Sequence, residues 1–138
     1  MKEYVKEIID LAYKSFENDE VPVGAIVVKK GVIIGRGFNN REKSHLVTGH
    51  AEINAINDAC KKCGDWRLDG CDLYVTLKPC LMCSGAIIDS RIKNIYYLCD
   101  RTDVCYYNAV DCIKIQESEF CNEYVKLLKL FFENKRNL

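Results

Sequence analysis

The chain has 138 residues, 49% of them hydrophobic, so it is long enough to form one domain with a substantial core. Its 20 Lys and Arg residues balance its 20 Asp and Glu residues, which excludes bulk positive charge as the basis of nucleic-acid binding and leaves only local patches. We find no signal peptide, transmembrane run or lipidation motif, and an odd count of nine cysteines does not fit a secreted disulfide scaffold. We therefore expect a cytoplasmic protein with reduced thiols and no membrane contact.

The first third of the chain predicts a helix followed by a β-hairpin. Residues 2 to 18 read as an amphipathic helix because apolar side chains recur at helical spacing. These are Val5, Ile8, Ile9, Ala12 and Phe16. A β-rich run, a tight turn at Gly31 and a second β-rich run predict a hairpin over residues 24 to 37. A loop from about Asn39 to Gly49 follows.

A second helix is predicted to begin at His50 and to end at Gly64. The predicted inward face has residues spaced by three and four: His50, Ile53, Ile56, Cys60 and Cys63. His50 and Glu52 then lie in its first turn. We interpret Cys60 and Cys63 as buried core thiols and not as a second metal pair, because no other His or Cys cluster lies near them in sequence.

A strand over residues 71 to 77 leads to Pro79, a residue that favours a helix start, and Cys80, Cys83 and Ile87 share one face of the helix that follows. Both potential ligand groups are thus predicted at helix N-termini. Unpaired N–H groups there favour negative charge and stabilise thiolates.

The rest of the chain completes a predicted sheet. A strand over residues 93 to 99 requires a parallel crossover from the preceding strand, and residues 113 to 115 form a short last strand. The final helix, from residue 119 to about 135, directs Phe120, Tyr124, Leu127 and Phe131 inward. We predict an α/β fold, with a five-stranded mixed sheet in a three-layer α/β/α arrangement, as a single domain over residues 1 to 138.

His50, Cys80 and Cys83 are ligands of the kinds that zinc prefers, and three of them leave one tetrahedral position open, as in a catalytic site. Glu52 would not ligate the metal but would take a proton from water and pass it on. We expect one zinc per subunit. The order H-x-E followed by P-C-x-x-C is a known signature of zinc nucleobase deaminases, so this step matches an established pattern.

With these motifs in place, the sequence resembles the cytidine deaminase-like superfamily and, within it, the bacterial tRNA-specific adenosine deaminases. The blocks that carry the resemblance cover most of the chain: residues 21–25, 35–39, 50–53, 66–68, 73–80, 83–86 and 90–92. The resemblance implies that His50, Cys80 and Cys83 bind zinc and that Glu52 shuttles protons. It further implies that Asn39 hydrogen-bonds the target base, that the backbone near Ala51 helps to hold it, and that the protein is a homodimer.

The function that the resemblance implies is deamination of adenosine to inosine at the wobble position of a tRNA. The final helix is similar to that family's tRNA-contacting end helix, and Phe132 and Leu130 are predicted near its rim beside cationic side chains. The candidate basic rim for an anticodon loop consists of Lys126, Lys129, Lys135, Arg136 and Arg91. The short apolar helix from Cys83 to Ser90 is predicted to be buried on several sides, as at a dimer interface.

Other functions stay open, because the sequence departs from that family's pattern. Leu46 to Gly49 replace its usual residues before the metal His, and the stretch from Asp100 to Asn108 is shortened. Thr102 and Asp103 faintly resemble a pair in guanine deaminases. One alternative is therefore a deaminase of a free base or nucleoside, guanine or cytosine/cytidine; another is a nonenzymatic subunit with structural zinc, against which Glu52 argues.

Overall fold

The computed structural model describes residues 1–101 and 111–136, without the side chain of Arg136. Its helices and strands, in chain order, are α1 (Lys2–Glu17), β1 (Gly24–Lys29), β2 (Val32–Phe38), α2 (Arg41–Ser44), α3 (Ala51–Cys63), β3 (Cys71–Leu77), α4 (Leu81–Asp89), β4 (Asn94–Cys99), β5 (Cys112–Lys114) and α5 (Ser118–Arg136). The strands form one sheet in the order β2-β1-β3-β4-β5. The β1 strand is antiparallel to β2 and β3, whereas β3, β4 and β5 run parallel, so the predicted mixed sheet is confirmed.

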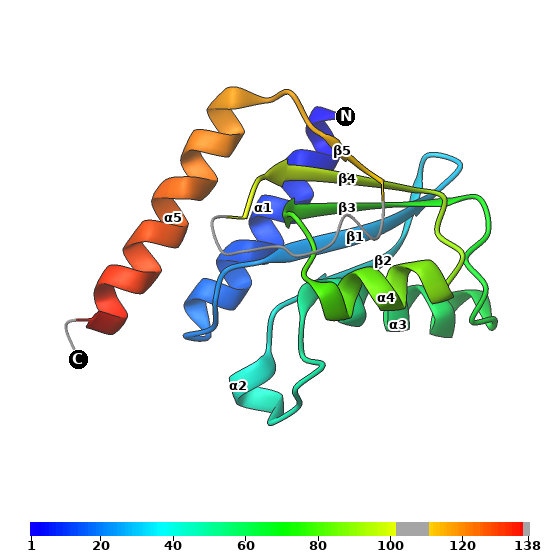
Figure 1. Cartoon of the computed structure of the whole chain (residues 1–138), viewed down its shortest axis with the longest axis horizontal. Helices are drawn as coiled ribbons and strands as arrows, with labels where there is room; N and C mark the ends of the chain where they lie inside the picture. The colour runs from blue at the N-terminus through cyan, green and yellow to red at the C-terminus, as the bar shows by residue number, and fades with distance from the viewer. Residues whose placement is uncertain (102–110, 137–138) are drawn as a thin grey trace.

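Helices cover both faces of this sheet, as Figure 1 shows: α1 and α5 lie on one face and α3 and α4 on the other. Alternate strand residues supply the two cores because successive side chains point to opposite faces. Ile26 and Tyr74 pack with α1 and α5, while Val27 and Leu73 pack with α3 and α4. The predicted three-layer arrangement is therefore confirmed.

The inward face of α3 differs from the prediction. The buried residues of this helix are Ala51, Glu52, Ala55, Ile56 and Ala59, whereas Cys63 is exposed and Cys60 is half-buried. The reason lies in β2: a Cβ on Gly35 would lie 2.5 Å from the carbonyl oxygen of Ala55, and one on Gly37 would lie 2.4 Å from that of Ala51. The two glycines let the alanine face pack directly on the strand, which turns the larger side chains to the flanks.

Two further boundaries differ from the prediction. The region expected as a loop contains α2, one turn of helix, which projects away from the layers (Figure 1). The last strand is Cys112–Lys114, shifted by one residue. The segment from 102 to 110, on which the predicted shortening and the Thr102 and Asp103 resemblance rest, lies outside the described residues.

One cysteine pair departs from the expectation of reduced thiols. Cys99 at the end of β4 is joined to Cys121 of α5 by a disulfide, with Cα atoms 5.9 Å apart. The thiols of Cys60, Cys63, Cys71, Cys80 and Cys83 form no disulfide. In the described part of the chain, no helix combines the length and apolar character needed to cross a membrane.

Candidate active site

The fold brings the three predicted metal ligands together. The Nδ1 atom of His50 lies 3.6 Å from Sγ of Cys80 and 3.5 Å from Sγ of Cys83. The three ligand atoms all lie within 4.8 Å of one another, and they are the only such group of metal-ligating side chains among the described residues. Residues thirty positions apart in sequence therefore share one site.

Each ligand group sits at the start of a helix. His50 is the N-cap of α3 and Cys80 is the N-cap of α4, both with extended backbone, and Cys83 lies in the first turn of α4. The carbonyl ends of the parallel strand β3 and the N-terminal end of α4 meet here. Sites in open α/β sheets form at this edge, where helix N-termini favour anionic groups such as thiolates.

A hydrogen bond between the two thiols shifts their pKa values in opposite directions. The hydrogen bond from Cys83 is the largest of the effects that lower the pKa of Cys80 to about 3, and the hydrogen bond with His50 acts in the same direction. The same hydrogen bond, together with burial, raises the pKa of Cys83 above its usual range. Cys80 is therefore the thiolate of the pair at neutral pH, with Cys83 as its donor.

The donor set fits a tetrahedral zinc ion. Zinc–nitrogen bonds of about 2.0–2.1 Å and zinc–sulfur bonds of about 2.3 Å, at tetrahedral angles, place the two ligand atoms about 3.5 Å apart. The observed separations of 3.6 and 3.5 Å match this value without any movement of the side chains. One imidazole and two thiols leave the fourth position open.

Glu52 lies in the first turn of α3, two residues after His50, and is 4% exposed. Burial raises the pKa of its carboxyl group to about 7. A carboxyl group with a pKa near the working pH can both accept and release a proton, as a general acid and base must. Glu52 is close enough to the thiols to interact with Cys83, so it faces the ligand group.

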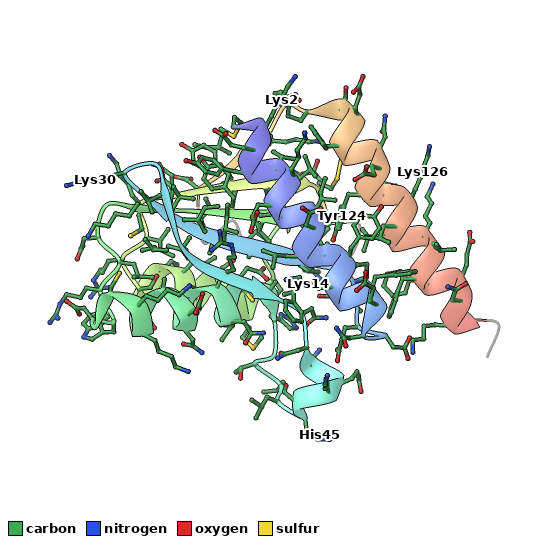
Figure 2. The ribbon with its side chains drawn as sticks, turned by 180° about the vertical axis from the view of Figure 1, so that it is seen from behind. Lys2, Lys14, Lys30, His45, Tyr124 and Lys126 are labelled. Carbon is green, nitrogen blue, oxygen red and sulfur yellow. A yellow bond between two sulfur atoms is a disulfide. The ribbon has the colours of Figure 1, made fainter. Side chains whose placement is uncertain are left out.

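A cleft of about 1470 Å³ connects this group to α5. Its lining residues come from seven parts of the chain: the loop before β1, Asn39, α2, the start of α3 with His50 to Glu52, Leu77 at the end of β3, residues 99–101 at the end of β4, and the second half of α5. In the view of Figure 2, α1 and α5 stand side by side and α2 projects below them, with His45 at its tip. The volume of the cleft exceeds that of a single base.

Asn39 and Ala51 both line this cleft. The amide nitrogen Nδ2 of Asn39 donates to the carbonyl oxygen of Val21 at 3.1 Å, which fixes the orientation of the side chain. Its oxygen Oδ1 is buried and accepts no hydrogen bond from the described residues. Ala51 is fully buried at the start of α3, where backbone N–H groups have no acceptor within the helix. The site therefore offers an unpaired acceptor, Oδ1 of Asn39, beside the N-terminal end of α3.

The predicted basic rim is only partly at the cleft. Lys129 and Lys135 line it, whereas Lys126 and Arg91 do not, and the side chain of Arg136 lies outside the described residues. Figure 2 shows Lys126 on the outer side of α5, opposite Tyr124, which faces α1. Lys135 is bound to Asp19 at 2.7 Å across the cleft.

The aromatic residue at the end of α5 is positioned as predicted. Phe132 is 46% exposed and lines the cleft, while Leu130 is equally exposed but points elsewhere. The sequence interpretation missed Arg41 and Lys43 of α2, which line the opposite wall. Asn40, a favoured N-cap residue directly before them, was the signal that could have revealed this helix.

Comparison with known proteins gives consistent relatives. The tRNA-specific adenosine deaminase of Aquifex aeolicus (strain VF5) is 39% identical over an alignment of 148 positions, which covers 99% of this chain and 97% of the relative. The tRNA-specific adenosine deaminase of Bacillus subtilis (strain 168) is 48% identical over 94 residues, or 68% of this chain. The match spans only 58% of that Bacillus protein.

Solved structures agree with the fold. A structure from a study of A-to-I editing by tRNA:A34 deaminases superimposes with a TM-score of 0.81 at 32% identity, covering 93% of this chain and 100% of that one. A guanine deaminase from Bacillus subtilis superimposes with a TM-score of 0.69 at 40% identity, covering 74% of this chain and 66% of that one. The model of the MafB19-like deaminase family matches residues 1–136. The chain belongs to the MafB19-like deaminase family.

Proposed function

We propose that this chain is a single-domain, zinc-dependent deaminase that converts adenosine to inosine at the wobble position of a tRNA. The observation that carries the proposal is the ligand group of His50, Cys80 and Cys83 beside the buried Glu52, at the floor of a cleft that extends to α5. The relatives named as tRNA-specific adenosine deaminases support the choice of substrate.

In this proposal His50, Cys80 and Cys83 hold one zinc per subunit. When bound, zinc polarises a water molecule and makes its proton easier to remove. Glu52 accepts that proton as oxygen adds to the carbon bearing the exocyclic amine, and passes it to the ring nitrogen. It then takes the second proton from the added hydroxyl group and gives it to the amine, which leaves as ammonia. Adenosine and water are thus converted to inosine and ammonia. The raised pKa of Glu52, about 7, suits a group that serves both proton transfers.

In this proposal the base is held by Asn39 and by the N-terminal end of α3. Oδ1 of Asn39 accepts a hydrogen bond from the target base, and the backbone at Ala51 donates one. A buried acceptor without a partner raises the free energy of the protein. A bound base that donates a hydrogen bond to Asn39 removes this penalty and so binds more tightly. These two contacts position the reacting carbon above Glu52.

The RNA around the base is held at the far end of the cleft. The exposed Phe132 stacks on an unpaired base, and Lys129, Arg41 and Lys43 lie within reach of phosphates. The neutral chain has no bulk positive field, so this local arrangement has to supply the electrostatic attraction. A role on tRNA also corresponds to a cytoplasmic location.

The protein acts as a homodimer in this proposal. Within one chain α4 buries Ile87 on one side only and leaves Leu81 and Ile88 exposed, at 59% and 46%. The expected burial of this helix on several sides is therefore not met by the single chain. A second copy covering the exposed side of α4 would complete it. Sedimentation of a clean monomer at micromolar concentration would contradict the dimer.

A second candidate is deamination of free guanine, which the 40% identity to a guanine deaminase favours. One experiment separates the two candidates. The protein is incubated with transcribed tRNA carrying a wobble adenosine and, separately, with free bases and nucleosides, while ammonia release is followed; Glu52→Gln is the matched inactive control. We expect ammonia from tRNA only. Ammonia from guanine and none from tRNA would make the small-molecule candidate correct.

A truncation tests whether the end of α5 contributes to RNA binding. Deleting residues 132 to 138 should weaken tRNA deamination strongly, and added salt should weaken binding by the intact protein, because phosphate contacts release counterions. If the truncated protein deaminates tRNA as well as the intact one, α5 has no role in binding it.

A further inference from the structure

One buried carboxylate takes no part in the proposed reaction. Glu20 lies in the loop between α1 and β1 and is 1% exposed, so it is among the most deeply buried side chains of the molecule. A carboxylate loses hydration on burial and is retained in protein interiors only when hydrogen bonds replace the lost water. The partners of Glu20 therefore indicate what it stabilises.

Those partners are backbone groups of α2. Oε1 of Glu20 accepts a hydrogen bond from the N–H of Glu42 at 2.9 Å, and Oε2 accepts one from the N–H of Lys43 at 2.8 Å. Asn40, the N-cap of α2, makes no side-chain capping bond. Glu20 thus caps this helix from a point twenty residues earlier in the chain. A helix of four residues has little stability of its own, so this contact decides its position.

The position of α2 decides the shape of one cleft wall. Arg41 and Lys43 line the cleft from α2, and Asn39 lies directly before it. On the other side, the N–H of Asn40 donates to the carbonyl oxygen of Gly49 at 2.9 Å, directly before His50. A Cβ on Gly49 would come within 2.7 Å of Cα of Arg41, so the two ends of this loop are in close contact.

The residues after Glu20 hold Asn39 as well. The carbonyl oxygen of Val21 accepts from Nδ2 of Asn39 at 3.1 Å, and that of Val23 accepts from its N–H at 3.1 Å. The segment from Glu20 to Val23 therefore fixes both Asn39 and α2. Displacement of Glu20 would therefore move Asn39 together with Arg41 and Lys43 of α2.

We infer that Glu20 is a positioning residue for substrate binding: its buried carboxylate clamps α2 through two backbone N–H groups and so fixes the cleft wall that carries Asn39, Arg41 and Lys43. This inference rests on the proposed function for its substrate. Glu20 is not assigned a role at the reacting atoms, because both oxygens of its carboxylate accept hydrogen bonds from backbone N–H groups of α2. Its loss should weaken binding of substrate and leave proton transfer by Glu52 intact.

The test compares Glu20→Gln with the wild-type protein. The amide replaces one acceptor oxygen with a donor that faces a backbone N–H, so the clamp loses one hydrogen bond. We expect KM for tRNA to rise about tenfold and kcat to change less than about twofold. This pattern is expected when the lost interaction stabilised the bound substrate and the transition state equally. Zinc content should stay near the wild-type value, whereas the thermal unfolding temperature should fall by several degrees because a buried donor is left unpaired. Glu20→Asp, which keeps the charge on a shorter side chain, should fall between the two.

Asp58→Asn is the matched control. Asp58 is also a carboxylate that accepts a backbone N–H, from Arg36 at 2.9 Å, but it does not line the cleft. We expect its KM to equal that of the wild type. An equal rise in KM for Asp58→Asn and Glu20→Gln would overturn the inference, since loss of any such carboxylate would then suffice.

Amide hydrogen exchange tests the clamp without substrate. In Glu20→Gln the N–H groups of Glu42 and Lys43 should exchange at least about tenfold faster than in the wild type, while those of α3 keep their protection. Unchanged exchange at both amides would overturn the inference whatever the substrate is. If the wild type deaminates no tRNA, the proposed function fails, and the exchange result still decides whether Glu20 holds α2.

Discussion

The chain has two C-x-x-C pairs, one before β3 and one after it, and they differ in their position on a helix, in the burial of their second cysteine and in their neighbours. Cys80 and Cys83 lie at the N-terminal end of α4, beside His50. Cys60 and Cys63 lie in the last turn of α3, where Cys63 is exposed. Burial and the neighbouring Cys63 raise the pKa of Cys60, whereas the pKa of Cys80 falls to about 3.

The difference teaches that spacing alone does not make a metal site. The N-terminal end of a helix favours thiolates and the C-terminal end disfavours them, because the unpaired backbone groups carry opposite partial charges. A third ligand is also needed, and the fold supplies His50 to one pair only. Among the described residues, no His, Asp or Glu completes a group around Cys60 and Cys63.

The largest expected effect tests this comparison directly. Replacing Cys80 or Cys83 by Ser should remove zinc and deaminase activity together, because the site loses one of three protein ligands. Cys60→Ser and Cys63→Ser should keep both. Metal analysis of the purified variants decides the matter. Two zinc ions in the wild type, or metal loss from Cys60→Ser, would remove the distinction between the pairs.

The next effect concerns the acid-base group beside the ligands. Glu52→Gln should keep zinc and fold but lower kcat by about 10² to 10⁴, since one side chain serves both proton transfers. The measurement is single-turnover deamination with metal analysis of the same sample. Retained activity at full zinc content would mean that another residue moves the proton.

Close packing at Gly37 of β2 fixes the N-terminal end of α3, next to the metal ligands. Gly37→Ala should destabilise the fold by about 1–3 kcal/mol, because its Cβ would meet the backbone of Ala51 and Ala55 at 2.4 Å. We also expect weaker zinc binding, since His50 directly precedes Ala51. Urea unfolding and a zinc competition titration measure the two effects.

Gly85→Ala is the control for that substitution. Gly85 lies inside α4, and apart from its chain neighbours and the backbone of the helix no heavy atom lies within 4 Å of the position its Cβ would take. Because Gly85 is on the exposed side of α4 that the proposed dimer covers, the variant is measured as a monomer, which it should stabilise by about 0.5–1 kcal/mol, the usual gain of Ala over Gly within a helix. Equal losses in Gly37→Ala and Gly85→Ala would refute the role of close packing.

The smallest effect is expected at the other end of α3, beside the free pair. Gly64 ends the helix in the left-handed conformation with φ of 68°. Gly64→Ala should cost about 1 kcal/mol of unfolding free energy, because a Cβ is strained there. Zinc content should not change. Zinc loss in this variant would show that the two ends of α3 are not independent.

The sequence by itself indicated most of the elements and the group of potential metal ligands. Strict helical spacing in residues 2 to 18 and a β-rich run over 71 to 77 predict α1 and β3, because local periodicity suffices for long amphipathic segments. The H-x-E and P-C-x-x-C motifs indicated His50, Cys80 and Cys83, since zinc chemistry restricts ligand types and spacing.

Only the tertiary structure decided which face of α3 is buried. The spacing of Ile53, Ile56 and Cys60 suggested a face of large side chains, but Gly35 and Gly37 leave room for an alanine face to pack closer. Close packing depends on the shape of the partner strand, which no pattern within the helix records. The same holds for α2, because Glu20 caps it from outside the local sequence, and local periodicity cannot report a contact between distant segments.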